Sequence, residues 1–314
     1  MVMQLLGWTI SSGDDKRRPF SKSFEILGAV ISLPSSAGGP VEVSNKASRL
    51  EQLSDQVIEL RRSFNKTISR SFLESVKGRL LYAAGHTFGR STQLACQLLH
   101  RVSGSAASVM VTAELIHVVS EALSLLIAAK PRKIDRWSDL PPILIFTDGA
   151  VEDNGGKGTH GALLLDPVHQ RNFVFGDFVP ENFVNAWMKF GKRQVIAQTE
   201  IFPVLVAKET WTEEIRGRSI LWFLDNESAK MALIRNFSPV IDSFMLLQAN
   251  AVLDVETQSR NWYSRVPSES NPSDSASRLE FGEYENSFQC IPCYTKVTST
   301  ISRFESLVES LEMG

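Results

Sequence analysis

The sequence predicts an α/β fold: a mixed five-stranded sheet flanked by helices, preceded by a β-hairpin and a mainly helical region. The first observation is a change in the period of the apolar residues. Between residues 44 and 130 they recur every three or four positions, which is typical of amphipathic helices, whereas after Pro131 short apolar runs of strand length alternate with helical segments. The second observation is that two of those runs end in an acidic residue.

Residues 1–34 are expected to form the hairpin, because the β-like runs Leu5–Ile10 and Phe24–Leu33 flank a polar turn. A Pro-, Gly- and Ser-rich linker follows, and residues 35–136 are predicted to be mainly helical. Ser44 is the expected N-cap of the first helix. The next two helices are predicted over Phe72–Ala84 and Ala106–Ala129.

Residues 137–281 are expected to form the sheet and its helices, and residues 282–314 are a tail without an assigned role. Strands are predicted at Ile143–Phe146, Ala162–Leu165, Asn172–Phe178 and Ser219–Leu224, and near Trp262. Helices are predicted at about Val195–Ile215, Ser228–Arg235 and Ile241–Thr257, and near Asp274. The tryptophans at 211, 222 and 262 are expected in the core.

The charge of the chain is divided unevenly. The whole sequence has 33 Lys+Arg against 35 Asp+Glu, a formal net charge of −2. Residues 1–136 hold 18 basic and 11 acidic residues, whereas residues 137–314 hold 15 and 24. This pattern suits a basic half that binds phosphates and an acidic half that binds metal ions, and chance clustering on solvated faces is the alternative.

The cysteine content and the N-terminus indicate an intracellular protein, with cytoplasm and nucleus not distinguished. Three cysteines are an odd number that builds no disulfide framework, and no signal peptide is recognisable. No apolar stretch reaches the ~20 residues that a membrane span requires, so no membrane partner is expected.

Four acidic residues form the candidate site. Asp148 and Asp225 follow apolar strands, Glu200 stands in an otherwise apolar helical stretch, and Asp274 begins the last short helix. Carboxylates brought together in this way repel unless divalent cations lie between them, and hard oxygen ligands suit Mg²⁺ or Mn²⁺. Taken singly, each acid is better explained without a metal, Asp148 and Asp274 as N-caps and Glu200 as a surface acid, but the four in this order of strands and helices are not.

The order of these motifs resembles the ribonuclease H family over about Ile143–Phe281. The resemblance rests on Thr147-Asp148-Gly149-Ala150 with a glycine-rich hairpin after it, on Gln198-Thr199-Glu200, on Leu224-Asp225-Asn226 and on Asn271-Pro272-Ser273-Asp274. It implies a ribonuclease H-like sheet and metal-dependent cleavage of the RNA strand of RNA/DNA hybrids. The related exonucleases carry a second acid two residues after the first, where this chain has Ala150.

The resemblance also implies roles for individual residues. Asp148, Glu200, Asp225 and Asp274 would be catalytic and would hold two Mg²⁺ ions, with Mn²⁺ as a substitute. Contacts to the hybrid are implied for Gly149, Ala150, Gln198, Asn226 and Arg278. Phosphate contacts from the helical region are expected from Arg49, Arg61, Arg62 and Lys66.

The upstream segment resembles the end of a reverse transcriptase. Leu6-Gly7-Trp8 and Phe24–Ile31 are similar to a palm end with its primer-gripping hairpin, and the helices to a thumb or connection region, as in retroelement-derived proteins of dinoflagellates. The Tyr-x-Asp-Asp turn of a polymerase is absent, and Asp14-Asp15 is interpreted as an exposed turn. The missing palm or a polyprotein segment is therefore an expected partner.

One departure from the family pattern keeps a second interpretation open. Many members carry a histidine in the loop before the last acid, and residues 255–273 contain none. The alternative to the nuclease is therefore a catalytically inactive relic, or a connection-type accessory domain that only binds nucleic acid.

Overall fold

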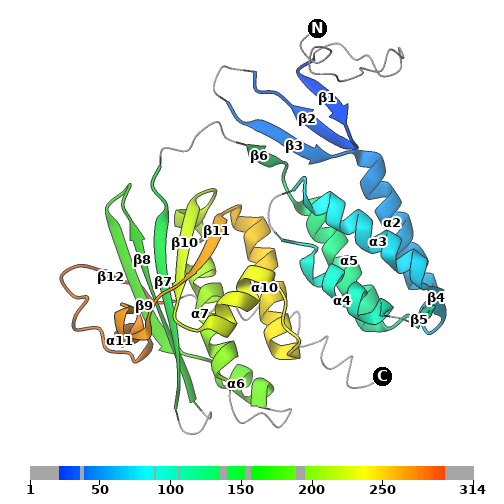
Figure 1. Ribbon diagram of the computed structural model, residues 1–314. Helices are drawn as coiled ribbons and strands as arrows, with labels where there is room; N and C mark the ends of the chain where they lie inside the picture. The colour runs from blue at the N-terminus through cyan, green and yellow to red at the C-terminus, as the bar shows by residue number, and fades with distance from the viewer. Residues whose placement is uncertain are drawn as a thin grey trace, which may run out of the picture.

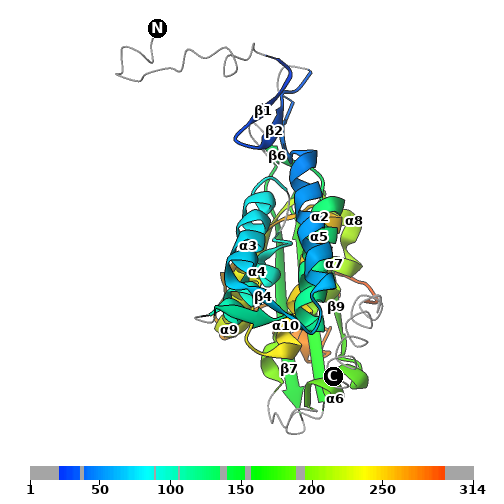
Figure 2. The same ribbon diagram turned by 90° about the vertical axis from the view of Figure 1, so that its right-hand side faces the viewer.

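In the described residues, the computed structural model contains a four-stranded sheet, a six-stranded sheet, a two-stranded ladder and two groups of helices (Figures 1 and 2). It describes residues 21–35, 39–87, 90–104, 107–134, 140–152, 157–188 and 195–293. Within these ranges no helix has the length and apolar character needed to cross a bilayer.

The N-terminal sheet is antiparallel and has the order β1-β2-β3-β6. Its strands are β1 (Ser23–Ile26), β2 (Ala29–Ser32), β3 (Val41–Asn45) and β6 (Arg132–Ile134). A tight turn at Leu27-Gly28, where both residues have positive φ, joins β1 to β2. The predicted strand Phe24–Leu33 is therefore itself the hairpin, while Leu5–Ile10 and Asp14-Asp15 lie outside the described residues.

The helices between β3 and β6 form their own core. They are α2 (Ala47–Arg62), α3 (Arg70–Ala84), α4 (Gln93–Ser103) and α5 (Ala113–Ala128), with a small ladder between β4 (Thr67–Ser69) and β5 (Ser108–Met110). Leu53, Val57 and Leu60 of α2 are buried in this core, as their spacing predicts. Ser44 is not an N-cap, because β3 continues through it and α2 begins after Lys46.

Two further boundaries in the helical region differ from the prediction. The helix expected at Ala106–Ala129 begins only at Ala113, because Ser108–Met110 pairs with β4 and Thr112 caps the helix by accepting a hydrogen bond from the Leu115 N–H. Helix α4 was missed. The predicted helix Phe72–Ala84 is confirmed as α3.

The main sheet confirms the predicted fold class. Its order is β11-β10-β7-β8-β9-β12, with β8 antiparallel to both its neighbours and β7, β10 and β11 parallel. The strands are β7 (Ile143–Glu152), β8 (Lys157–Asp166), β9 (Arg171–Phe178), β10 (Ser219–Leu224), β11 (Arg260–Arg265) and β12 (Gln289–Cys290). The short β12, from the predicted tail, adds a sixth strand to the five expected. Residues 153–156, part of the glycine-rich hairpin, lie outside the described ranges.

Helices pack on both faces of this sheet (Figure 1). One face carries the apolar helix α7 (Ile196–Thr210) with α10 (Ile241–Thr257) packed beside it, and α6 (Glu181–Met188), α8 (Thr212–Ile215) and α9 (Glu227–Arg235) complete this layer. The other face carries the single-turn helix α11 (Asp274–Ser277) over β8 and β9. Trp211 and Trp222 are buried as expected, but Trp262 is 69% exposed, so that part of the core prediction is wrong.

The helical region contacts the main sheet layer through apolar packing and through Arg90. Leu125 of α5 packs against Val252 and Val255 of α10. Arg90 donates hydrogen bonds to the carbonyl oxygens of Leu233 (2.6 Å) and Ile234 in the last turn of α9. A cation at the end of a helix is electrostatically favourable there, so this contact fixes the position of the 90–92 segment.

Burial of His160 predicts acid sensitivity. Its ring lies between Phe175 and Phe202, its Nδ1 has no hydrogen-bond partner, and burial lowers the pKa of His160 to about 4. The unfolded chain takes up this proton below about pH 6.5, so the free energy of unfolding should fall by ~3 kcal/mol between pH 6.5 and 4. His160→Phe should flatten this part of the profile in urea titrations, and the exposed His100→Phe should leave it unchanged.

Candidate metal centre

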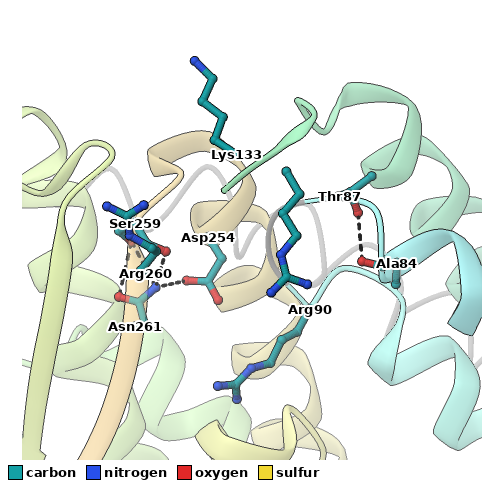
Figure 3. Close-up of a pocket in the computed structure, with 9 residues that line it drawn as sticks. Ala84, Thr87, Arg90, Lys133, Asp254, Ser259, Arg260 and Asn261 are labelled. Atoms are coloured by element: carbon teal, nitrogen blue, oxygen red, sulfur yellow. Dashed lines mark hydrogen bonds between the residues drawn. The ribbon is translucent and has the colours of Figure 1, made fainter. Parts of the chain in front are cut away.

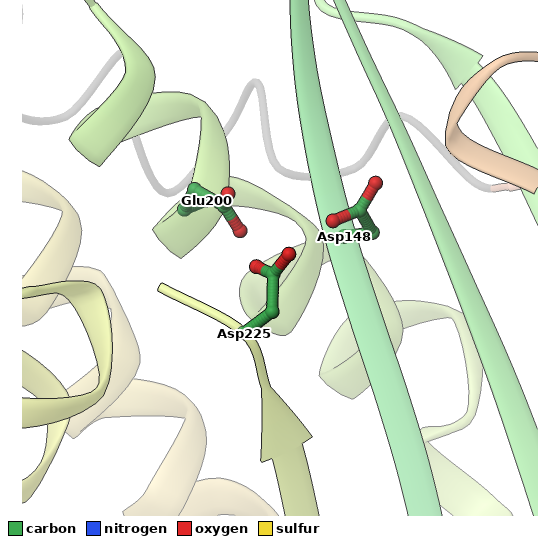
Figure 4. A group of neighbouring side chains, drawn as sticks. All are labelled: Asp148, Glu200 and Asp225. Carbon is green, nitrogen blue, oxygen red and sulfur yellow. The ribbon is translucent and has the colours of Figure 1, made fainter. Parts of the chain in front are cut away.

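Three carboxylates converge at one end of the parallel strands (Figure 4). Asp148 lies within β7, Glu200 on the second turn of α7, and Asp225 directly after β10. One oxygen from each lies within 4.8 Å of the others. The parallel register of β7 and β10 brings the two aspartates together, since Phe146 pairs with Phe223 two residues before each.

Gly149 lets α7 approach β7 closely enough to bring Glu200 to Asp148. A Cβ at position 149 would lie against the carbonyl group of Thr199 and 2.9 Å from the Glu200 nitrogen, a distance that real Cβ atoms do not adopt. The Gly149 N–H also donates a hydrogen bond to the Glu200 carboxylate. The glycine of the first motif is therefore required by packing.

A second close approach positions Asp148 from the other face. Gly161 and Gly176 are register partners on β8 and β9, and a Cβ at either would collide with Ala276 or Ser277 of α11. The Ser277 hydroxyl, brought in by this contact, donates a hydrogen bond to Asp148 Oδ2. The Asn271 amide donates to the Thr147 carbonyl oxygen at 3.2 Å and lies 3.5 Å from Asp148 Oδ1.

The electrostatics of the three acids favour a bound cation. Burial, reinforced by the charges of Asp148 and Asp225, raises the pKa of Glu200 to about 9. Burial also raises the pKa of Asp148, against the opposing hydrogen bond from Ser277. Glu200 Oε2 and Asp225 Oδ1 are buried and have no hydrogen-bond partner in the described structure. Buried carboxylate oxygens without a hydrogen-bond partner are suitable ligands for a divalent cation such as Mg²⁺ or Mn²⁺.

Asp274 does not belong to this group of three. It begins α11 as predicted, but its carboxylate is paired with Arg278, with Oδ2 to Nε and Oδ1 to Nη2 both at 3.0 Å. This ion pair also occupies Arg278, the predicted hybrid contact. Both side chains are about half exposed, so solvent screens the pair. The charge of Asp274 still contributes to the raised pKa of Asp148.

The predicted hybrid-binding residues near the acids differ in accessibility. Gln198 is buried, and its amide donates to the Ser243 hydroxyl of α10 at 3.1 Å, so the prediction that it contacts the hybrid does not fit this structure. The Asn226 oxygen caps α9 by accepting from the Ala229 N–H at 3.0 Å. Gly149 is buried by α7, whereas Ala150 is partly exposed beside Asp148.

The predicted phosphate-binding residues of the helical region lie at opposite ends of α2. Arg49, near its start, stacks on the Tyr82 ring at 4.0 Å. Arg61, Arg62 and Lys66 are exposed near its end, and Arg61 donates to the Ser120 hydroxyl at 3.3 Å. Twelve residues of helix, ~18 Å, separate Arg49 from Arg61, so the four residues do not form one patch.

Sequence reasoning missed Ser277 and the side chain of Asn271 as supports of Asp148. Asn271 stands in the motif quoted for the terminal acid, and Ser277 follows Asp274 by three residues, but a pattern of acidic residues does not reveal either one. Their neutral hydroxyl and amide groups orient a carboxylate without neutralising its charge.

Comparison with known proteins gives matches of structure only. No known family profile matches the chain, and no curated protein matches it. Among solved structures it is similar to the ribonuclease H1 of Halobacterium salinarum, at 17% identity over 46% of this chain and 99% of that one, with a TM-score of 0.35. LC11-RNase H1 in complex with an RNA/DNA hybrid gives 14% identity over 45% and 97%, with a TM-score of 0.32. A foamy viral protease-reverse transcriptase in complex with double-stranded DNA gives 10% over 78% and 38%, with a TM-score of 0.30.

Divalent cations should stabilise the folded chain through these acids. In EDTA, Asp225→Asn should unfold at a higher temperature than the natural chain, because it removes a negative charge that contributes to the raised pKa values of Asp148 and Glu200. Mn²⁺ or Mg²⁺ at ten times its dissociation constant should add about 1.4 kcal/mol to the natural chain and much less to this variant. Differential scanning calorimetry measures both effects. Glu227→Gln, two residues away, serves as the control, and an unreduced cation response in Asp225→Asn would contradict the assignment.

Gly149→Ala should damage the site through packing. The added methyl group must push α7 away from β7, at a cost of ~1–3 kcal/mol. Gly78→Ala is the matched control, because a Cβ there meets nothing within 4 Å and Ala favours the interior of helix α3. Urea unfolding should show the first variant destabilised and the second stabilised. Equal stability of the natural chain and Gly149→Ala would show that α7 has room to move.

Proposed function

We propose that this chain hydrolyses the RNA strand of RNA/DNA hybrids in a metal-dependent endonucleolytic reaction. The observation that carries the proposal is the convergence of Asp148, Glu200 and Asp225 from three separate elements, with unpaired buried oxygens on two of them. A purely structural cluster of this kind would destabilise the fold, because among the described residues no cation forms an ion pair with these three carboxylates.

Asp148, Glu200 and Asp225 would hold the ions, and Asp274 would join them if its carboxylate turned from Arg278. When bound, Mg²⁺ or Mn²⁺ lowers the pKa of a water molecule and neutralises the negative charge that develops on the leaving 3′ oxygen. The protein's own part is orientation: Ser277 and the Gly149 N–H fix the carboxylates of Asp148 and Glu200.

Recognition of RNA would depend on groups beside the acids. The 2′-hydroxyl distinguishes RNA from DNA, and Ala150 and Asn226 flank the acids where a minor groove would present it. The exposed residues Arg61, Arg62 and Lys66 would contact phosphates farther along the duplex. We also propose that the chain derives from a retroelement reverse transcriptase whose palm lies outside it, on the basis of the upstream motifs.

Binding without cleavage is the second candidate function. The specific observation in its favour is the Asp274–Arg278 ion pair, which keeps the fourth acid out of the group of three. The absence of a histidine at 255–273 points the same way. This candidate predicts hybrid binding that is indifferent to Mg²⁺ and no product with either metal.

Single carboxamide substitutions separate the two candidates. Asp148→Asn and Asp225→Asn should each reduce cleavage of an end-labelled hybrid at least about a thousandfold, because each removes a charged metal ligand. Hybrid binding, measured by fluorescence anisotropy in EDTA, should stay within about twofold. Glu227→Gln should cut normally. Unchanged cleavage in either aspartate variant would disprove the assigned site, and an inactive natural chain that still binds would favour the second candidate.

A further inference from the structure

The sheet has a second surface feature that leads directly to the acids. Alternate residues of a strand share a face, and the register places Trp262 beside Leu221 and Leu221 beside Leu144. One step farther along, Phe223 lies beside Phe146. We call these five apolar residues the aromatic strip. Asp225 and Asp148 follow Phe223 and Phe146 by two residues, and Asp148 lies on the face of the strip.

The strip is only partly covered by the described residues. Phe146 and Phe223 stack at 4.7 Å with their planes 14° apart, and both remain partly exposed. Tyr284 packs over β8 and β9 on the same face. Trp262, on the edge strand β11, is 69% exposed, whereas Trp187, Trp211 and Trp222 are buried. A large exposed indole on a flat surface is suited to stacking.

The end of the strip that is farther from the acids is basic. Arg260 precedes Trp262 on the same face, and its Nε donates to the Ser219 hydroxyl at 3.2 Å. It also lines a cleft of about 300 Å³ between β11 and the helical region, together with Arg90, Arg132 and Lys133. Lys133 forms an exposed ion pair with Glu42 at 3.7 Å, and Arg90 donates to carbonyl oxygens of α9, so Arg132 and Arg260 supply most of the positive charge of the cleft. Asp254 faces this cleft as well, but the fully buried Lys208 compensates its charge. In Figure 3 the Lys133 ammonium points outward from the rim of the cleft.

We propose that the aromatic strip binds an unpaired segment of nucleic acid, with a base stacked on Trp262 and phosphates at the basic cleft. Aromatic platforms beside cationic grooves are how proteins bind single strands. Trp262 is in register with Leu221 and Leu144, which precede Asp225 and Asp148 by four residues, or ~13 Å along the β-strands. A nucleic-acid strand bound to the strip therefore reaches the metal centre. The inference deepens the proposed function, because it assigns to the same site a substrate with a single-stranded flank.

Binding measured without metal tests the proposal independently of cleavage. We would titrate labelled oligo(dT), and a hybrid with and without an overhang, in EDTA and follow fluorescence anisotropy. Trp262→Ala should weaken oligo(dT) and overhang binding at least about fivefold and leave the blunt hybrid unchanged. Trp262→Phe should retain most of the affinity. Phe178→Ala, which removes an exposed aromatic from β9, is the matched control.

The charge contribution has its own control pair. Arg132→Gln should reduce the slope of log affinity against log salt for oligo(dT) by about one. Arg70→Gln should not change this slope, because Arg70 lies at the end of α3 that is remote from the cleft. Equal oligo(dT) affinity of Trp262→Ala and the natural chain would overturn the proposal. Two other results would also overturn the proposal. If the natural chain were a dimer that Trp262→Ala dissociates, the strip would bind a second copy of the chain. If removal of residues 294–314 tightened oligo(dT) binding, the strip would bind that segment. If the hybrid is not cleaved but oligo(dT) binding still depends on Trp262, the proposed nuclease activity is disproved and the proposed binding by the strip stands.

Discussion

Close packing of two helices on opposite faces of one sheet governs the whole candidate site. Helix α7 meets β7 at Gly149, and α11 meets β8 and β9 at Gly161 and Gly176. At each of these glycines the backbones are too close to leave room for a Cβ. These contacts are short-range and steric, so they tolerate almost no displacement. The carboxylates consequently stand on rigid elements, and their mutual repulsion is resisted by the packing of the sheet rather than by flexible side chains.

The two ends of the parallel strands carry opposite charges. The carboxylates lie toward the C-terminal ends of β7 and β10, whereas the guanidinium groups lie around the N-terminal end of β11. Lys208 and Asp254 neutralise each other in the interior between the two ends, with Asn250 and Tyr263 completing the hydrogen bonds of the ammonium. A polyanion close to this molecule would be attracted at one end and would require cations at the other.

Local pattern was sufficient for much of the fold and for part of the site. Asp148 and Asp225 could be predicted because each follows an apolar run of strand length, although β7 continues through Asp148, and β10 and α10 have the predicted bounds. Gln198 could not be placed correctly, because its partner Ser243 comes from a distant helix. Alternation in β11 shows which residues share a face with Trp262 but not whether that face is covered, which depends on where distant segments such as α11 pack. Ser44 failed as a cap because strand pairing overrides a local capping preference.

The N-terminal sheet has a consequence for the architecture of the chain. Val43 of β3 pairs directly with Arg132 of β6, so the polypeptide enters and leaves the helical region on adjacent strands, about 4.8 Å apart. Everything from α2 to α5 is thus an insertion whose two ends meet, with a hydrophobic core of its own. Because its two ends meet on one ladder, a short turn would have the length to join β3 directly to β6, with loss of the contacts that the helices make with α9 and α10.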